Sequence, residues 1–237
     1  MDEIEWWEFA SQAELAEQVA GDIGFVVESA IGAHGGARLA LAGGPKRDHI
    51  YAALVKQKLD WAKVTVLPTD DRVVGHDEEI SMVRQLGVHF TPVGANIVPL
   101  VDEAALDNYR EAGRLADERL KMIDWPLDLV LLGMAEDGHT ASIFPGPDFD
   151  RAVNGPKERR AIGVRPYPMP DFAAVERVTL TAPALASARA VMIAIAGQAK
   201  RELLERAIRE GPLSALPIGR VLAAIEAPVD IFWSAEE

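Results

Sequence analysis

Five short apolar runs, separated by amphipathic or polar sequence, constrain the fold of this chain more than any other feature. They span 37–42, 63–67, 127–132, 177–181 and 190–196. Runs of this kind are typical of strands buried on both faces of a sheet. Helical periodicity between them predicts a helix that starts at Ser11, with Glu14 at capping-box spacing, and further helices over 47–59, 77–86, 102–122 and 198–209. The alternation predicts one α/β domain over 1–237, with a mostly parallel sheet and helices on both faces.

The balance of charge narrows the classes of partner. The chain has 24 Lys and Arg against 37 Asp and Glu, a formal net charge of −13. Such a charge repels phosphate backbones and anionic lipids, so we expect neither nucleic acid nor membrane as a partner. It also repels a small phosphorylated substrate. A site for one therefore needs a local cluster of Lys, Arg and backbone N–H groups.

Two further absences limit the chemistry of the protein and its expected location. The chain has no cysteine, which excludes disulfides, thiolate nucleophiles and cysteine-ligated zinc. The first five residues are acidic where a signal peptide is basic, and no apolar run approaches the ~18 residues that span a bilayer. We expect a cytoplasmic protein, either a monomer or a homodimer.

Two glycines, Gly43 and Gly44, follow the run at 37–42 and precede Pro45, which suits the first turn of a helix. Glycine lets the backbone approach a ligand closely, and a helix N-terminus adds partial positive charge, so an anion can bind there. A simple tight turn explains the same residues. The segment is neither a Walker loop nor a G-x-G-x-x-G fingerprint.

The run at 63–67 leads into Thr69-Asp70-Asp71-Arg72. Because parallel strands end at the same edge of a sheet, these residues are expected beside the glycine turn. Arg72 can clamp a phosphate, and its charge keeps Asp70 ionised and able to accept a proton. The alternative is an exposed ion pair that contributes little.

A histidine-bearing loop follows the run at 127–132. His139 comes after an Asp137-Gly138 turn. Imidazole titrates near neutrality, so His139 can take a proton from water and return it, with Asp137 orienting the ring. The alternative is a histidine that caps a short helix beginning at Thr140.

Lys200 stands in the first turn of the helix predicted at 198–209. A cation at a helix N-terminus opposes the helix dipole, which indicates a compensating anion. A solvated surface lysine is the alternative.

Together, the segments around Gly43, Asp70, His139 and Lys200, with the Arg-Val-Thr-Leu-Thr-Ala-Pro-Ala-Leu segment at 177–185, resemble the 6-phosphogluconolactonase family. The resemblance covers most of the chain, and its most specific block is Asp-Gly-His-Thr-Ala-Ser-Ile-Phe-Pro-Gly at 137–146. It implies a Rossmann-like domain, shared with glucosamine-6-phosphate deaminases. It also implies hydrolysis of 6-phospho-D-glucono-1,5-lactone to 6-phosphogluconate in the pentose phosphate pathway, without metal or other cofactor.

The resemblance also implies residue roles. His139 activates water on the lactone carbonyl with Asp137 beside it, and Asp70 lies next to the sugar. The substrate, and its phosphate above all, is held by residues that include Gly43, Gly44, Arg72, Gly138 and Lys200.

One departure from the family concerns the phosphate loop. The family usually has Gly-Gly-Ser-Thr-Pro-Lys, whereas Gly44 here is followed directly by Pro45 and Lys46. Two hydroxyl donors are missing, and Pro45 has no N–H. We therefore expect Lys46 or Arg47 to supply the lost contact.

Three other functions are weighed against the lactonase. An amino-sugar phosphate deaminase or isomerase on this fold tends to continue toward Asn-Glu-Pro-Gly, but Ile143-Phe144-Pro145-Gly146 offers no carboxylate. A non-catalytic sugar-phosphate-binding protein would not need His139. A serine hydrolase using Ser142 lacks the G-x-S-x-G elbow.

Overall fold

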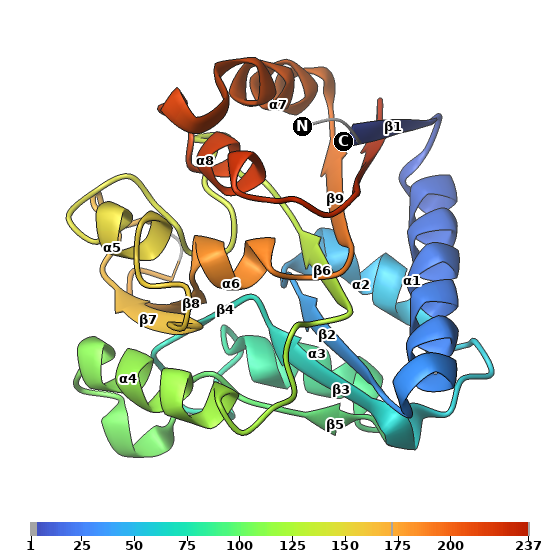
Figure 1. Ribbon diagram of the computed structural model, residues 1–237, viewed down its shortest axis with the longest axis horizontal. Coiled ribbons are helices and arrows are strands. Elements are labelled where there is room, and N and C mark those ends of the chain that lie inside the picture. The colour runs from blue at the N-terminus through green and yellow to red at the C-terminus, as the bar shows by residue number, and fades with distance from the viewer. Residues whose placement is uncertain (1–3, 172, 237) are drawn as a thin grey trace.

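A seven-stranded sheet, parallel throughout, runs through the centre of the protein (Figure 1). The computed structural model describes residues 4–171 and 173–236 and, within them, all side chains except those of Pro45 and Lys46. The strands lie in the order β1-β10-β9-β6-β2-β3-β5, which confirms the predicted α/β class and mostly parallel sheet. Their bounds are β1 (Ile4–Phe9), β2 (Ala37–Leu41), β3 (Val64–Pro68), β5 (Asn96–Ile97), β6 (Leu129–Leu132), β9 (Val191–Ala196) and β10 (Val229–Ser234).

The predicted strand at 177–181 lies outside the parallel sheet. It forms β8 (Arg177–Leu180), the middle strand of a small antiparallel sheet with β4 (Asp70–Arg72) and β7 (Ala161–Val164). A short apolar run shows that a strand is buried but does not identify its partners. The small sheet matters for the site because β4 follows the C-terminal end of β3.

Three strands of the parallel sheet, β1, β5 and β10, are absent from those that the sequence predicts. β1 is an edge strand, and Trp7 on it is 43% exposed, with its indole N–H donating to Asp230 Oδ1 at 3.0 Å. Trp6 is partly buried and packs against the hydrophobic core. The Trp6-Trp7 pair thus divides between core and surface, as the alternation of side chains along a strand requires.

Alternate residues of the same strands pack against different helices. Leu39 and Leu41 of β2 share one hydrophobic cluster with α1 (Gln12–His34), α2 (Pro45–Leu54) and α3 (Met82–Phe90). Ala40 shares the other cluster with α4 (Tyr109–Leu120), α6 (Ala182–Ala186), α7 (Gln198–Glu210) and α8 (Pro217–Ala223). Figure 1 shows α1 on one side of the sheet and α6 and α8 on the other. The shorter helices are α5 (Phe149–Val153) and the 3₁₀ helices η1 (Trp61–Lys63), η2 (Glu103–Ala105) and η3 (Gly211–Leu213).

Capping groups account for where several helices begin. At α1 the Ser11 hydroxyl accepts the N–H of Glu14 at 3.2 Å, as the capping-box spacing predicts. The helix predicted at 77–86 is wrong at its start, because α3 begins only at Met82, whose N–H donates to the carboxylate of Asp71 at 2.6 Å. The helix predicted at 102–122 is two elements, η2 and α4, because Asn108 caps a new start.

The length and composition of these helices show whether any of them could cross a membrane. Among the described residues, none of the helices combines the length and the apolar character that crossing a bilayer requires.

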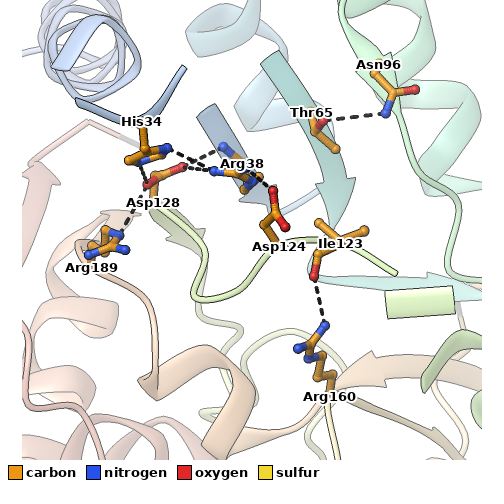
Figure 2. A network of polar contacts seen from close by, with 9 residues as sticks. All are labelled: His34, Arg38, Thr65, Asn96, Ile123, Asp124, Asp128, Arg160 and Arg189. Carbon is orange, nitrogen blue, oxygen red and sulfur yellow. Dashed lines mark hydrogen bonds and ion pairs between the residues drawn. The ribbon is translucent and has the colours of Figure 1, made fainter. Parts of the chain in front are cut away.

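The N-terminal ends of the central strands carry a closed network of charges around Asp128, which precedes β6. The carboxylate of Asp128 is 2% exposed and accepts hydrogen bonds from His34 Nε2 at 2.9 Å and from the backbone N–H of Arg38 at 2.8 Å. Arg189 Nε lies 3.5 Å from it, and Arg38 also bonds to Asp124 (Figure 2). At this end of the sheet, the charged groups around Asp128 are therefore paired with one another.

The opposite ends of the strands contain the switch point of the fold. From β2 the chain moves outward to β3 and β5, whereas from β6 it moves the other way to β9. A crevice opens where the direction of winding reverses, beyond the carboxyl ends of the strands, and ligands of such folds bind there.

Candidate active site

A cavity of about 250 Å³ lies at this switch point. Its walls come from the ends of β2 and β6, the loop 139–144, strands β4 and β8, and the starts of α2, α3 and α7. It brings together five residues that the sequence predicts for the site: Gly43, Asp70, Arg72, His139 and Lys200.

His139 is held by Asp137 through two hydrogen bonds to one oxygen. Asp137 Oδ1 lies 2.6 Å from Nδ1 of the imidazole and 3.1 Å from the backbone N of His139. Partial burial alone would raise the pKa of Asp137, but these bonds outweigh it and hold the pKa below its usual range. With Nδ1 donating to Asp137, Nε2 is the nitrogen left to accept a proton.

The backbone around His139 is a tight turn that excludes the helix-capping alternative. Gly138 has φ 78°, and its N–H donates to Ala135 O at 3.0 Å. Thr140 forms an isolated antiparallel bridge with Ile143 and begins no helix. The ring of Phe144 stands 4.1 Å from the His139 ring, centroid to centroid, which further restricts the imidazole.

Asp70 is positioned by a serine of the same loop. Ser142 Oγ donates to Asp70 Oδ2 at 2.5 Å, and the backbone N–H of Ser142 donates to Thr179 Oγ1 at 3.1 Å. Ser142 is 1% exposed. This geometry makes Ser142 a partner of Asp70 rather than the nucleophile of a serine hydrolase.

The neighbouring carboxylate, Asp71, points away from the cavity. It is 1% exposed and accepts the N–H groups of Arg72, Met82 and Val83. Burial nevertheless dominates and raises its pKa to about 6. Asp71 therefore joins β4 to the start of α3.

Among the side chains that the structure describes, four cationic ones line the cavity: Arg47, Arg72, Arg177 and Lys200. Arg177 is absent from the site residues that the sequence predicts, and Arg47 appears there only as a substitute for missing hydroxyls. Such a cluster in an acidic protein supplies the local positive potential that an anionic ligand needs.

Unpaired polar atoms also indicate an anionic ligand in this cavity. In the described part of the chain, the buried side-chain atoms without a hydrogen-bond partner are Arg47 Nε, Arg72 Nε, Thr140 Oγ1 and Arg177 Nη1. All four residues line this one cavity. Because buried polar atoms are normally bonded, this concentration indicates a site for a ligand rich in oxygen acceptors.

Arg47 reaches the cavity floor because residue 133 is a glycine. Arg47 Nη2 donates to Ala194 O of β9 at 2.8 Å, and burial lowers the pKa of its guanidinium. A Cβ at Gly133 would stand only 2.3 Å from Nη2. Gly133, the residue after β6, thus leaves room for the guanidinium of Arg47.

Other predicted residues lie near the cavity without lining it. Gly44 caps α2 with φ 109°, and Asp137 acts on His139 from outside. Gly138 is buried against Leu216. The side chain of Lys46 lies outside the described residues.

Gly43 has a packing role as well as a place at the cavity. A Cβ there would stand 1.7 Å from Sδ of Met82, so the absence of a side chain accommodates this methionine, which also lines the cavity. No group of three or more His, Asp or Glu side chains within the described residues is arranged to hold a metal ion.

The fold and the cavity define a doubly wound α/β enzyme whose site suits a small anionic substrate. The chain matches the family model described as glucosamine-6-phosphate isomerases/6-phosphogluconolactonase over residues 10–233. The 6-phosphogluconolactonase of Rhizobium meliloti is 33% identical over 230 residues, which cover 95% of this chain and 97% of that protein. The 6-phosphogluconolactonase of Mesorhizobium japonicum is 34% identical over 233 residues, covering 97% and 94%.

Solved structures agree with the sequence comparison. The crystal structure of a 6-phosphogluconolactonase from Shewanella baltica superimposes with a TM-score of 0.89 at 28% identity, covering 99% of both chains. The protein therefore belongs to the glucosamine-6-phosphate isomerase/6-phosphogluconolactonase family.

Proposed function

We propose that this protein hydrolyses 6-phospho-D-glucono-1,5-lactone to 6-phosphogluconate, a reaction of the pentose phosphate pathway. The observation that carries the proposal is the pairing of an oriented histidine, His139 on Asp137, with four cations in one cavity. The names of the relatives at 33% and 34% identity support the same substrate.

In the proposed reaction His139 is first a base and then an acid. Nε2 takes a proton from a water molecule as the water oxygen attacks C1 of the lactone. The tetrahedral oxyanion then collapses, the bond between C1 and the ring oxygen breaks, and the ring oxygen takes the proton back from His139. The carboxylic acid formed at C1 loses its proton to solvent and becomes a carboxylate.

The remaining residues position the substrate. Asp70, held by Ser142, would accept a hydrogen bond from a sugar hydroxyl. The cations and the backbone at Gly43 would hold the phosphate of the substrate and the negative charge that develops at C1. Fixing both ends of a reactive lactone supplies much of the rate gain by positioning.

The same geometry disfavours an amino-sugar phosphate deaminase or isomerase. Such an enzyme needs a carboxylate beyond the histidine to assist ring opening. Here the side chain packed on the His139 ring is Phe144, which has no carboxylate. A non-catalytic sugar-phosphate-binding protein would have no use for the pairing of Asp137 with His139.

A direct assay separates these functions. Purified protein is mixed with freshly made lactone, and acid release is followed against spontaneous opening in buffer. The wild type should accelerate opening, and His139→Ala should lower kcat by about 10²-fold or more. His49→Ala, an exposed histidine of α2, is the matched control and should match the wild type. Ammonia release from glucosamine 6-phosphate would instead support the deaminase, and binding without any turnover would support the sugar-phosphate-binding protein.

We also propose that residues 1–237 form a single 6-phosphogluconolactonase-like domain that acts in the cytoplasm. The span of the family match, 10–233, supports one domain. Limited proteolysis that yields two stable fragments would contradict it.

A further inference from the structure

The four cations of the cavity fall into two groups that belong to different parts of the fold. Arg47 and Lys200 stand on α2 and α7, the helices that follow β2 and β9, and both also line a second cavity of about 20 Å³. Arg72 and Arg177 stand opposite each other on β4 and β8 and do not line that second cavity. The main cavity therefore offers two cationic positions to one ligand.

The position formed by Arg47 and Lys200 suits a phosphate. Both residues lie in the first turn of a helix, where backbone N–H groups and the helix dipole favour negative charge. The glycines at 43 and 197 precede these helices with little side-chain bulk. A tetrahedral dianion can take donors here from several directions.

The position formed by Arg72 and Arg177 suits a smaller, planar anion. Arg177 is 4% exposed and donates from Nη2 to Ala173 O at 2.9 Å. Its Nη1 and the Nε of Arg72 have no partner among the described residues. Guanidinium groups bind carboxylates through such N–H donors, often two at a time.

The two guanidinium groups also disfavour each other. Burial, followed by repulsion from Arg72, lowers the pKa of Arg177 to about 10, with Asp70 and Asp71 partly offsetting both effects. An anion bound between the two arginines would relieve this repulsion.

The reacting end of the substrate belongs on this side of the cavity. Asp70 stands on the same strand as Arg72, and its partner Ser142 lies on the loop that carries His139. Phe144 of the same loop contacts the His139 ring. His139, Asp70 and the arginine pair thus surround one end of the cavity.

We propose that Arg72 and Arg177 bind the C1 end of the ligand, while Arg47 and Lys200 bind the phosphate. The pair would hold the lactone carbonyl oxygen, the oxyanion formed from it, and finally the carboxylate of the product. This assignment rests on the proposed lactone hydrolysis and gives Arg72 a different role from the phosphate contact that the sequence predicts. Because C1 is uncharged in the lactone and anionic in the product, the site binds the opened acid more tightly at this end.

Three ligands test this in the wild type by calorimetry, without turnover. 6-Phosphogluconate carries both anionic groups, glucitol 6-phosphate has the same chain and phosphate but an alcohol at C1, and gluconate lacks the phosphate. We expect 6-phosphogluconate to bind about tenfold or more tightly than glucitol 6-phosphate, the usual effect of a charge-assisted hydrogen bond. Equal affinities for these two ligands would overturn the proposal.

Substitutions locate the effect. Arg177→Met should weaken 6-phosphogluconate binding about tenfold and leave glucitol 6-phosphate within about twofold, and Arg177→Lys should fall between it and the wild type. Arg165→Met is the control, because Arg165 bonds Glu176 outside this cavity. Equal losses for both ligands in a folded Arg177→Met protein would assign Arg177 to the phosphate and refute the proposal. If that variant does not fold, the wild-type ratio still decides.

The lactone-opening assay on the same preparation separates this inference from the proposed function. Opening without a preference for the carboxylate ligand refutes the C1 site alone. A preference without opening supports the C1 site and refutes the hydrolysis.

Discussion

Gly133→Ala tests whether the glycine that follows β6 is needed to admit Arg47. The added Cβ would stand 2.3 Å from Nη2 and 3.3 Å from Cζ of Arg47. Ordinary van der Waals contact is at about 3.4 Å or more, so the guanidinium must move by about 1 Å. That movement breaks or weakens the 2.8 Å bond from Nη2 to Ala194 O and shifts the cation from the cavity.

The expected effect falls mainly on substrate binding. The guanidinium is the far end of a flexible side chain, so the clash is relieved by rotation, and we expect a stability loss of about 1 kcal/mol for the displaced hydrogen bond. A lost or misplaced charge-assisted contact to phosphate is worth about 1.5–3 kcal/mol, so KM for the lactone should rise by about 10- to 100-fold. kcat should change little, because the pairing of His139 with Asp137 lies elsewhere.

Steady-state kinetics and urea unfolding of the same variant provide the measurement. Gly21→Ala in α1 is the matched control, because a Cβ there meets no atom within 4 Å. The control should keep the wild-type KM and gain slightly in stability, since alanine favours a helix over glycine. A wild-type KM in Gly133→Ala would refute the reasoning, and so would a kcat that falls with KM unchanged.

Three further outcomes are expected. Ser142→Ala removes the hydroxyl that donates to Asp70 at 2.5 Å, so kcat/KM should fall by about tenfold while the urea midpoint stays close to wild type; unchanged kinetics would mean that Asp70 needs no such support. Asp137→Asn removes the charged acceptor from Nδ1 of His139 and permits the wrong tautomer, so kcat should fall by about 10- to 100-fold with KM nearly constant, and a change confined to KM would contradict that role. Burial raises the pKa of Asp71 to about 6, so between about pH 4 and pH 6 the folded protein holds a proton there that the unfolded chain has lost. The stability that this proton contributes is fully present below about pH 4 and is lost as the pH rises through about 6, and the total loss in the free energy of unfolding is about 3 kcal/mol. Urea unfolding at several pH values should therefore show Asp71→Asn gaining on the wild type between pH 4 and 7, whereas parallel curves would exclude the effect.

The sequence predicted the elements whose position depends on residues close together in the chain, above all the buried strands. Continuous apolar runs identify β2, β3, β6 and β9 because a strand buried on both faces needs no polar alternation. The start of α3 escaped prediction because, besides the local cap Ser81, it depends on the carboxylate of Asp71, which accepts the N–H groups of Met82 and Val83 from 11 and 12 residues away in the chain. The partners of β8 escaped it because they are set by where the chain returns rather than by the residues of the strand.

The same distinction applies to the site. His139, Asp70 and Lys200 follow strands and could be placed at one edge of the sheet from their positions alone. Arg177 begins a run predicted as a buried strand, and the residues that follow it suggest only core. An arginine in such a run is itself a signal, because arginine is seldom fully buried without a partner. Arg47 depended on Gly133, a contact between distant segments that no local pattern records.

The antiparallel pairing of β4 with β8 makes the arrangement of charges a property of strand alignment. Asp70 faces Thr179 and Arg72 faces Arg177, while Asp71 and Val178 alternate onto the other side. Deleting a single residue from β8 would bring a different neighbour opposite Arg72 and turn Arg177 toward the core. Such a chain would retain every residue assigned to the site and still lose the site, so ligand binding in this protein depends on the length of a strand as well as on its composition.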